Sequence, residues 1–424
     1  MSLDIRKDSL GTDVQPDEKE GETLAAQSPK RVYNLWSATA WQVLMMTSWT
    51  CNIILFDTVY DIGGPMIVIV TIGQGFLMAS LAEMCSIWPY AGGQQVFTQR
   101  LAPPSVRRFL SYAIGWVIFL GEIATAASCT MNSAQVCIGI IQISYPDWEA
   151  TRWLEWLMYV GLTILALTAS LSQKHLPLLS LVGGFIVIVG AIVWAALFLA
   201  LGPKQSASFV FTQFLNNSGY ESRGWVGIMS FYTPMYALYG TDGILHIAEE
   251  MKDPERNAPM LWRIAYNFSI PYVTWFVDVL QNPAGGIAFV VIILIVINLF
   301  ICMGLNTAAS RLTWGMARDN ALPFSNIFVQ INHTLDTPLN TLILSGVAQL
   351  IIGVVVFGSD YAFQVIISIG LVAIQVGYLI PTFLIVVTGR KALPTPRAFN
   401  LGAAGWAINI FSVCWCLLIS VMLL

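Results

Sequence analysis

Charged side chains are scarce in this chain of 424 residues. Asp, Glu, Lys and Arg make up 10% of it, whereas soluble proteins carry about 25%. No basic cluster is present and the net charge is −4, so nucleic acid is not an expected partner. The 3 histidines show no metal-ligand spacing, and no phosphate-binding loop, dinucleotide fingerprint or nucleophile elbow is found. We therefore expect no enzymatic activity and neither a metal site nor a cofactor.

The cysteines do not indicate a framework of disulfide bonds either. Most of the 7 cysteines lie inside apolar segments, where cysteine behaves as a small hydrophobe. Cys414 and Cys416 stand two residues apart on an apolar helix, so they point to different faces and make a poor metal pair. The first thirty residues are polar and lack the apolar stretch of a cleavable signal peptide. We expect residues 1–33 to form a disordered cytosolic tail.

Apolar residues dominate the rest of the chain. Hydrophobic types make up 56% of it, and the mean hydropathy is +0.70. This composition predicts an all-α polytopic membrane protein embedded in a lipid bilayer. Apolar runs of about 20 residues mark about eleven spans. The predicted spans are 35–56, 65–87, 109–131, 153–172, 178–201, 225–248, 264–280, 286–308, 340–357, 361–387 and 403–424.

The predicted seventh span is short. Arg263 and Asp278 enclose 14 residues. A helix of that length spans about 21 Å, whereas a hydrocarbon core is about 30 Å thick. Either the bilayer thins around it, or residues are missing from the chain. If the segment crosses, Lys and Arg concentrate in alternate loops, which places the N-terminus in the cytosol.

The predicted sixth span carries an unusual group of residues at its centre. Gly240, Thr241, Asp242 and Gly243 follow one another inside a segment long enough to cross a bilayer. A charged side chain at that depth costs roughly 2.5–3.5 kcal/mol on insertion scales. Backbone groups freed by glycines are tolerated there only when they line a cavity or a ligand. The pattern predicts a helix that ends near Tyr239, restarts near Gly243 and forms a binding site at the break.

Three ionisable residues in the spans each have functional interpretations and a structural one. Asp242 could hold a cationic amine or a proton, or it could cap the second half-helix. His246, one turn later on the same face, could relay protons or pack as a structural residue. Glu122, in the middle of the third span, could carry a proton, pair with a cationic substrate, or be protonated and bonded to a neighbouring helix. The charged run from Glu249 to Arg256 reads most simply as a solvated loop, with salt bridges as the alternative.

Four motifs in this order resemble a known family. They are GGQQVFTQRLAP (Gly92 to Pro103), HIAEEMKDPERNAP (His246 to Pro259), SRLTWGMARDNALPFS (Ser310 to Ser325) and TPLNTLILSG (Thr337 to Gly346). Together they are similar to the amino acid–polyamine–organocation permeases, in the fungal branch that contains amino acid, GABA and choline permeases. The resemblance runs from about Tyr33 to the end of the chain.

The resemblance implies a LeuT-like fold of two five-helix repeats with opposite topology, the first helix of each repeat being broken. The repeats would occupy about 34–201 and 225–387 of a permease domain that covers 34–424, with an extra span at 403–424. The family usually has a twelfth span, which is absent here. In span one, relatives carry glycines at the position of Met46 to Trp49, whereas this chain has none. Trp49 could offer its ring face to an amine, or it could be core packing.

The family implies a secondary transporter that moves an amino acid or a related small amine, such as GABA or choline, by alternating access. Protons are the favoured coupling ion, and the plasma membrane is favoured over the vacuole. The alternatives are a nutrient receptor that does not transport and an inactive, truncated permease. The candidate substrate-binding residues are Thr47, Ser48, Trp49, Tyr239, Gly240, Thr241, Asp242 and Gly243, and the candidate proton-coupling residues are Glu122, Asp242 and His246.

Overall fold

A computed structural model describes most of the chain. The described residues are 30–47, 50, 62–63, 67–145, 148–171, 173–201, 215–217, 219–231, 235–236, 238, 240, 242–255, 295–395 and 397–422. The predicted seventh span, 264–280, lies outside them. So do four candidate site residues: Ser48, Trp49, Tyr239 and Thr241.

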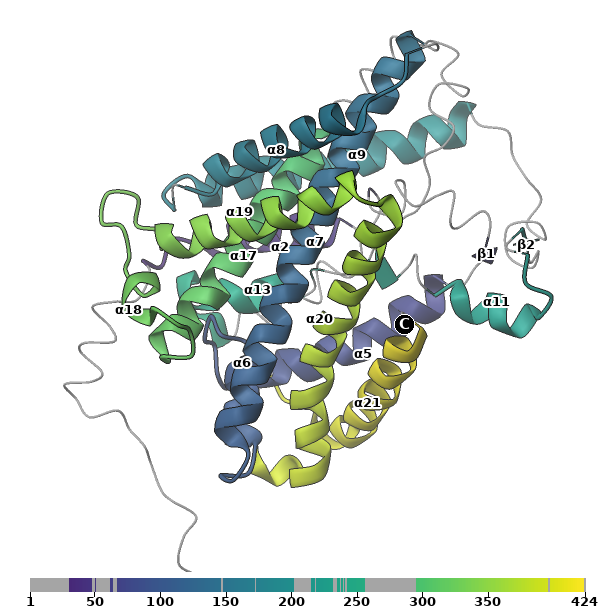
Figure 1. Ribbon diagram of the computed structural model, residues 1–424. Coiled ribbons are helices and arrows are strands. Elements are labelled where there is room, and N and C mark those ends of the chain that lie inside the picture. Colours follow the sequence, from purple (N-terminus) through teal and green to yellow (C-terminus); the bar gives the residue numbers. More distant parts are fainter. Residues whose placement is uncertain are drawn as a thin grey trace, which may run out of the picture.

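The described part is helical, which confirms the all-α prediction (Figure 1). Its sheet consists of β1 (Ile62–Gly63) and β2 (Leu215–Asn216), which pair antiparallel over two residues each. The helices are α2 (Leu35–Met46), α5 (Ile67–Cys85), α6 (Gln94–Leu101), α7 (Arg107–Ser144), α8 (Arg152–Ala169), α9 (Leu176–Leu201), α11 (Arg223–Met229), α13 (Gly243–His246), α17 (Ile297–Arg318), α18 (Ser325–Phe328), α19 (Leu339–Val354), α20 (Asp360–Thr388) and α21 (Gly405–Met422), with 3-10 turns at η1 (Ala248–Glu250), η4 (Val355–Phe357), η5 (Arg390–Ala392) and η6 (Gly402–Ala404).

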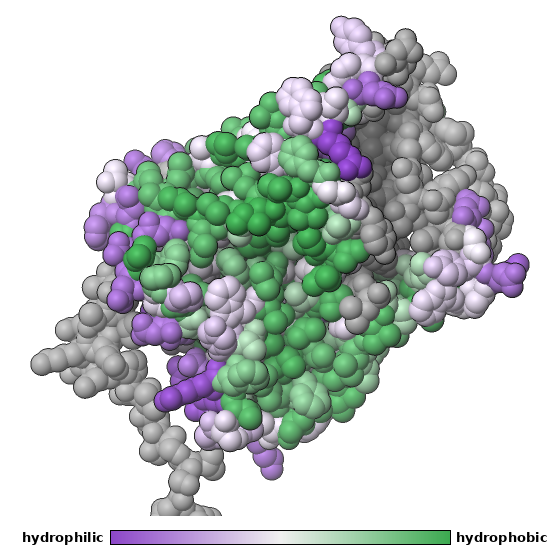
Figure 2. Space-filling model, viewed as in Figure 1, coloured by the Kyte–Doolittle hydropathy of each residue, from purple (hydrophilic) through white to green (hydrophobic). Residues whose placement is uncertain are grey.

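Five helical segments of the described residues are long and apolar enough to cross a membrane. They are Arg107–Ile141, Leu176–Leu197, Leu339–Phe357, Val365–Thr388 and Gly402–Met422. All five overlap predicted spans. Figure 2 shows a largely hydrophobic face over these helices, with hydrophilic residues gathered toward its rim. Large side chains such as Phe109, Phe185 and Val421 are exposed on the surface, as expected where a protein meets lipid rather than water.

Two helices extend well beyond their predicted spans. The predicted third span, 109–131, is part of α7, which continues to Ser144. The predicted eighth span ended at residue 308, whereas α17 continues to Arg318. Arg311 and Arg318 lie on this extension. In the fold, each arginine pairs with a glutamate from the end of the sixth span, so the helix can continue.

Helix α7 is the centre of the bundle, and its most extensive contact is with α20. Figure 1 shows the two helices side by side. Their backbones approach closely through glycines. A Cβ atom on Gly121 would lie 2.4 Å from Ile374, one on Gly370 would lie 2.4 Å from Ala124, and one on Gly377 would lie 2.6 Å from Ile118. Small residues that allow such approach are typical of helix pairs in membranes.

Residues at the N-terminal end of the described chain are packed against the sixth span. The Tyr33 amide donates to the Glu250 carbonyl at 3.0 Å, and the Lys252 amide donates to the Tyr33 carbonyl at 3.0 Å. Tyr33 is fully buried and stacks edge-on against Trp41. Tyr33 therefore belongs to the packed domain and not to the tail to which the prediction of 1–33 assigned it.

A buried carboxylate holds the last helix to the bundle. Glu83 at the end of α5 is fully buried, and its two oxygens accept hydrogen bonds from Arg390 at 2.8 Å each. The amide of Leu401 donates to the same carboxylate at 3.1 Å, and Arg397 lies 3.3 Å from it. Three donors from the segment that joins α20 to α21 thus converge on one side chain.

We expect Glu83→Gln to destabilise the protein strongly. Removing one partner of a buried ion pair leaves the other charge unpaired, which costs about 3–5 kcal/mol. Thermal unfolding of the detergent-purified protein measures the loss. The matched control is Glu155→Gln, because Glu155 bonds Gln135 near the surface. Equal unfolding temperatures for the two variants would contradict the assignment.

Candidate functional site

The sixth span is broken, as the glycines predict. Helix α11 ends at Met229, and α13 begins at Gly243. Between them, Gly240 has a φ of +78°, a left-handed conformation that glycine adopts without steric cost. The second half-helix begins at Gly243, as predicted, whereas the predicted end of the first half at Tyr239 lies outside the described residues.

A side chain of the first span bridges this break. Gln42 of α2 is fully buried, and its Nε2 donates to the carbonyl of Gly240 at 3.3 Å. Its Oε1 accepts from the amide of Ile244 at 3.0 Å. One carboxamide therefore satisfies a carbonyl before the second half-helix and an amide inside it. Sequence reasoning missed Gln42, although a glutamine in the middle of an apolar span is itself a signal of an interhelical hydrogen bond.

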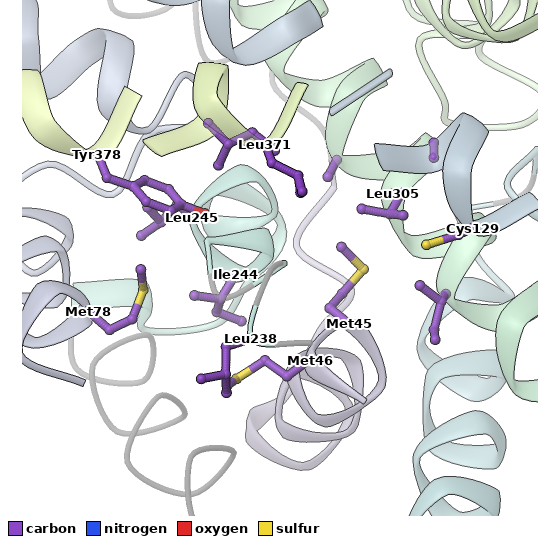
Figure 3. Close-up of a cluster of buried hydrophobic side chains, with 14 of the residues drawn as sticks. Met45, Met46, Met78, Cys129, Leu238, Ile244, Leu245, Leu305, Leu371 and Tyr378 are labelled. Atoms are coloured by element: carbon purple, nitrogen blue, oxygen red, sulfur yellow. The ribbon is translucent and has the colours of Figure 1, made fainter. Parts of the chain in front are cut away.

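Met45 fills the space beside the break. A Cβ atom on Gly240 would lie 2.8 Å from the Met45 carbonyl oxygen, and one on Gly243 would lie 3.1 Å from the Met45 methyl carbon. A Cβ atom on Gly304 of α17 would lie 2.2 Å from the Met45 sulfur. Figure 3 shows Met45 between Ile244 and Leu305. The three glycines thus form a slot between α2, α13 and α17 that a methionine side chain occupies.

Thr47 ends α2 and is buried, but its hydroxyl is used within its own helix. It donates to the carbonyls of Val43, at 3.2 Å, and Leu44. Of the predicted substrate-binding residues, the structure brings together Gly240, Asp242 and Gly243. Thr47 lies at the end of α2, two residues after Met45.

The three predicted proton-coupling residues meet in one buried cluster. Glu122 of α7 and Asp242 and His246 of the sixth span each place a ligand atom within 4.8 Å of the other two. All three side chains are 2% exposed or less. Gln94 at the start of α6 donates to Asp242 Oδ2 at 2.8 Å, and Tyr378 of α20 is a neighbour of that carboxylate. Gln94 and Tyr378 were not predicted from the sequence.

The hydrogen bonds of His246 determine where its protons lie. Its Nδ1 is 3.1 Å from the carbonyl oxygen of Ala91, which can only accept, so Nδ1 carries a hydrogen. Its Nε2 is 3.4 Å from Asp242 Oδ2. Two lone pairs in that contact would repel. The contact is favourable only when a proton or another cation is held between the imidazole and the carboxylate.

The cluster has more acceptors than donors. Among the described residues, Asp242 Oδ1 and Glu122 Oε2 are buried without a hydrogen-bond partner. Asp242 occupies the capping position of α13, but its side chain makes no capping hydrogen bond, so the capping interpretation is wrong. Two carboxylates and an imidazole are also ligands that a divalent metal ion accepts. Histidine spacing alone could not reveal this donor set, because Glu122 comes from another helix.

Ion pairs close the end of the sixth span. Glu249 accepts two hydrogen bonds from Arg318, both at 3.0 Å, and one from the amide of Ala91 at 2.9 Å. Glu250 pairs with Arg311, and both are about 1% exposed. The interpretation of this run as a solvated loop is therefore wrong for the two glutamates. Burial raises the pKa of neighbouring Asp319, and the Arg318 guanidinium opposes that shift.

Apolar helices, a broken span and a buried charged cluster at the break define a multi-pass integral membrane protein built around an internal polar site. The chain belongs to the amino acid permease family, whose model matches residues 33–270 and 263–424. The two matched segments overlap at the start of the predicted short span. Its curated relatives are named as transporters and permeases.

Three relatives illustrate the range of the family. The choline transporter of Saccharomyces cerevisiae is 27% identical over 420 residues, covering 91% of this chain and 74% of the relative. A homolog of amino-acid permease BAT1 from Oryza sativa subsp. japonica is 27% identical over 451 residues, covering 93% and 85%. Amino-acid permease 2 of Neurospora crassa is 27% identical over 377 residues, covering 81% and 68%.

We expect Gly240→Ala to disrupt the break. An alanine would have to adopt a φ of +78° and would bring its Cβ to 2.8 Å from the Met45 carbonyl oxygen. The matched control is Gly161→Ala in α8, where no atom lies within 4 Å of the added Cβ. Thermal unfolding should show a large loss for the first variant. For the second it should show no loss, or a small gain of about 0.5–1 kcal/mol. A Gly240→Ala variant as stable as Gly161→Ala would refute the strained geometry.

Proposed function

We propose that the protein moves a small amine-bearing solute across a membrane by alternating access, in symport with protons. The observation that carries the proposal is the buried cluster of Glu122, Asp242 and His246 at the broken sixth span. Buried carboxylates in a membrane protein are costly and mark pathways for ions or substrates. The N-terminus is assigned to the cytosol and the protein to the plasma membrane, as the loop charges and the family favour.

The polarity of the site favours a cation. Two buried carboxylate oxygens lack a partner among the described residues. The amide of Ile244, which could bind a solute carboxylate, is already bonded to Gln42. The end of α2 carries no glycine that would expose further amides. An amine or a quaternary ammonium ion therefore fits this site better than the carboxylate of an α-amino acid. The relatives include both a choline transporter and amino-acid permeases.

The same cluster supports protons as the coupling ion. A proton on His246 Nε2 would make its contact with Asp242 favourable, and Glu122 lies within reach of both. A proton held by these residues and a solute ammonium group would compete for the same carboxylates. Symport then requires at least two negative groups, one for each cation, and Glu122 and Asp242 provide them.

We expect Asp242→Asn to abolish solute uptake, because it removes a negative charge and leaves the fold's packing volume unchanged. Uptake of radiolabelled choline, GABA and a panel of amino acids in permease-deficient yeast measures the effect, at matched surface expression. Glu155→Gln is the control and should transport normally. Normal uptake by Asp242→Asn would remove this residue from the site. Solute-induced thermal stabilisation without any uptake would refute transport and indicate a receptor.

We expect Glu122→Gln to separate transport from proton coupling. In proteoliposomes with an inward proton gradient, the unaltered protein should accumulate solute, and an uncoupler should abolish the accumulation. The variant should retain solute exchange but lose most of the stimulation by the gradient. A gradient response equal to that of the unaltered protein would exclude Glu122 as a proton carrier.

A further inference from the structure

A cavity of about 490 Å³ lies at one end of the bundle, away from the buried cluster. It is formed where the first described residues, the start of α2, the start of α9 and the loop before α19 meet. Its lining divides into a polar part (Lys30, Asn34, Ser37, Gln173, Lys174 and Asp336) and an apolar part (Val32, Pro177, Leu178 and Leu181). The family assignment and the proposed solute site do not use this cavity.

The polar part favours an anion. Lys30 and Lys174 both line the cavity, whereas Asp336 is the one acidic residue in the lining. The N-termini of α2 and α9 also reach it, through Asn34 and Ser37 and through Pro177. Helix N-termini carry a partial positive charge, which adds to that of the lysines.

A buried and unpartnered side-chain atom points to a ligand with a donor group. Gln173 is fully buried, and its Nε2 donates to the Lys30 carbonyl at 2.9 Å. Its Oε1 has no hydrogen-bond partner among the described residues. An acceptor of this kind is costly to bury unless a donor reaches it. A phosphodiester group offers no donor, whereas the ammonium group of serine or a hydroxyl of inositol does.

The apolar part faces the lipid. Leu178 and Leu181, on the first two turns of α9, are 60% and 40% exposed. Helix α9 is an apolar segment long enough to cross a membrane, so its first turns lie where headgroups meet acyl chains. A ligand of this cavity can therefore have an anionic head at the lysines and an apolar chain along the leucines.

We propose that this cavity binds an anionic glycerophospholipid whose headgroup carries a hydrogen-bond donor, such as phosphatidylserine or phosphatidylinositol. The phosphate lies between Lys30 and Lys174, the headgroup donor bonds Gln173 Oε1, and an acyl chain follows Leu178 and Leu181. In the assigned topology, the cavity opens to the cytosolic leaflet, which is the leaflet that carries anionic lipids. The site does not depend on which solute the protein transports.

The test uses the full chain, purified in detergent. Native mass spectrometry and titration with a fluorescent phosphatidylserine should show one tightly held copy per chain. Phosphatidic acid, which lacks the headgroup donor, should bind more weakly, and phosphatidylcholine should fail to compete. Equal competition by phosphatidylcholine would overturn the proposal. If soluble glycerophosphoserine displaces the fluorescent lipid as effectively as phosphatidylserine does, the cavity is a site for soluble anions. That result would also overturn the proposal.

Two variants and one control locate the site. Lys174→Ala should weaken binding about fivefold, the effect of one lysine near an anionic lipid. Lys391→Ala is the control, since Lys391 is exposed in η5 and lies outside the cavity lining. Gln173→Leu should reduce the preference for phosphatidylserine over phosphatidic acid. If Lys174→Ala binds as well as Lys391→Ala, the cavity is not the site.

A variant that should strengthen lipid binding controls for loss of fold, because a misfolded protein would bind more weakly. Lys30 is paired with Asp336 at 2.9 Å. Asp336→Asn removes the competing carboxylate and should raise the affinity about two- to fivefold. Asparagine tolerates the φ of +52° at this position, so the loop geometry is retained. Unchanged or weaker binding by Asp336→Asn would contradict the assigned place of the phosphate.

Discussion

Peptide groups inside a bilayer have no water to bond, and this constraint organises the centre of the protein. Where the helix is interrupted at Gly240, some backbone amides and carbonyls lose their intrahelical hydrogen bonds and need other partners. Gln42 supplies both kinds of partner from a neighbouring helix, a donor for a carbonyl and an acceptor for an amide. The first and sixth spans are therefore joined by hydrogen bonds at the point where the sixth span is weakest. A break in a helix is stable here because another helix completes it.

Buried charged side chains are likewise stabilised by partners close to them. Glu83, Glu249 and Glu250 are each paired with an arginine. Asp242 and Glu122 have no arginine partner within the described residues. This difference separates groups that hold the fold together from groups that remain available to a solute or a proton. Stability and function are thus assigned to different carboxylates of one chain.

The sequence predicts the class of fold and the place of the break, because apolar runs and a Gly-Thr-Asp-Gly group are local signals. It also predicts Glu122, Asp242 and His246 as special, since ionisable residues in apolar spans are rare. It does not predict that the three converge, which depends on how α7 packs against the sixth span. Gln42, Gln94 and Tyr378 were missed for the same reason. The partners of Arg311 and Arg318 could not be named from the sequence, because they are distant in it.

The glycine contacts between α7 and α20 have a consequence for the polar centre. A bulkier residue at Gly121, Gly370 or Gly377 would push the two helix axes apart. Helix α7 carries Glu122, and α20 carries Tyr378, a neighbour of Asp242. The distance between Glu122 and Tyr378 therefore depends on glycines, which have no side chain. A single methyl group added at one of these glycines would therefore alter the electrostatics of the site without changing any ionisable residue.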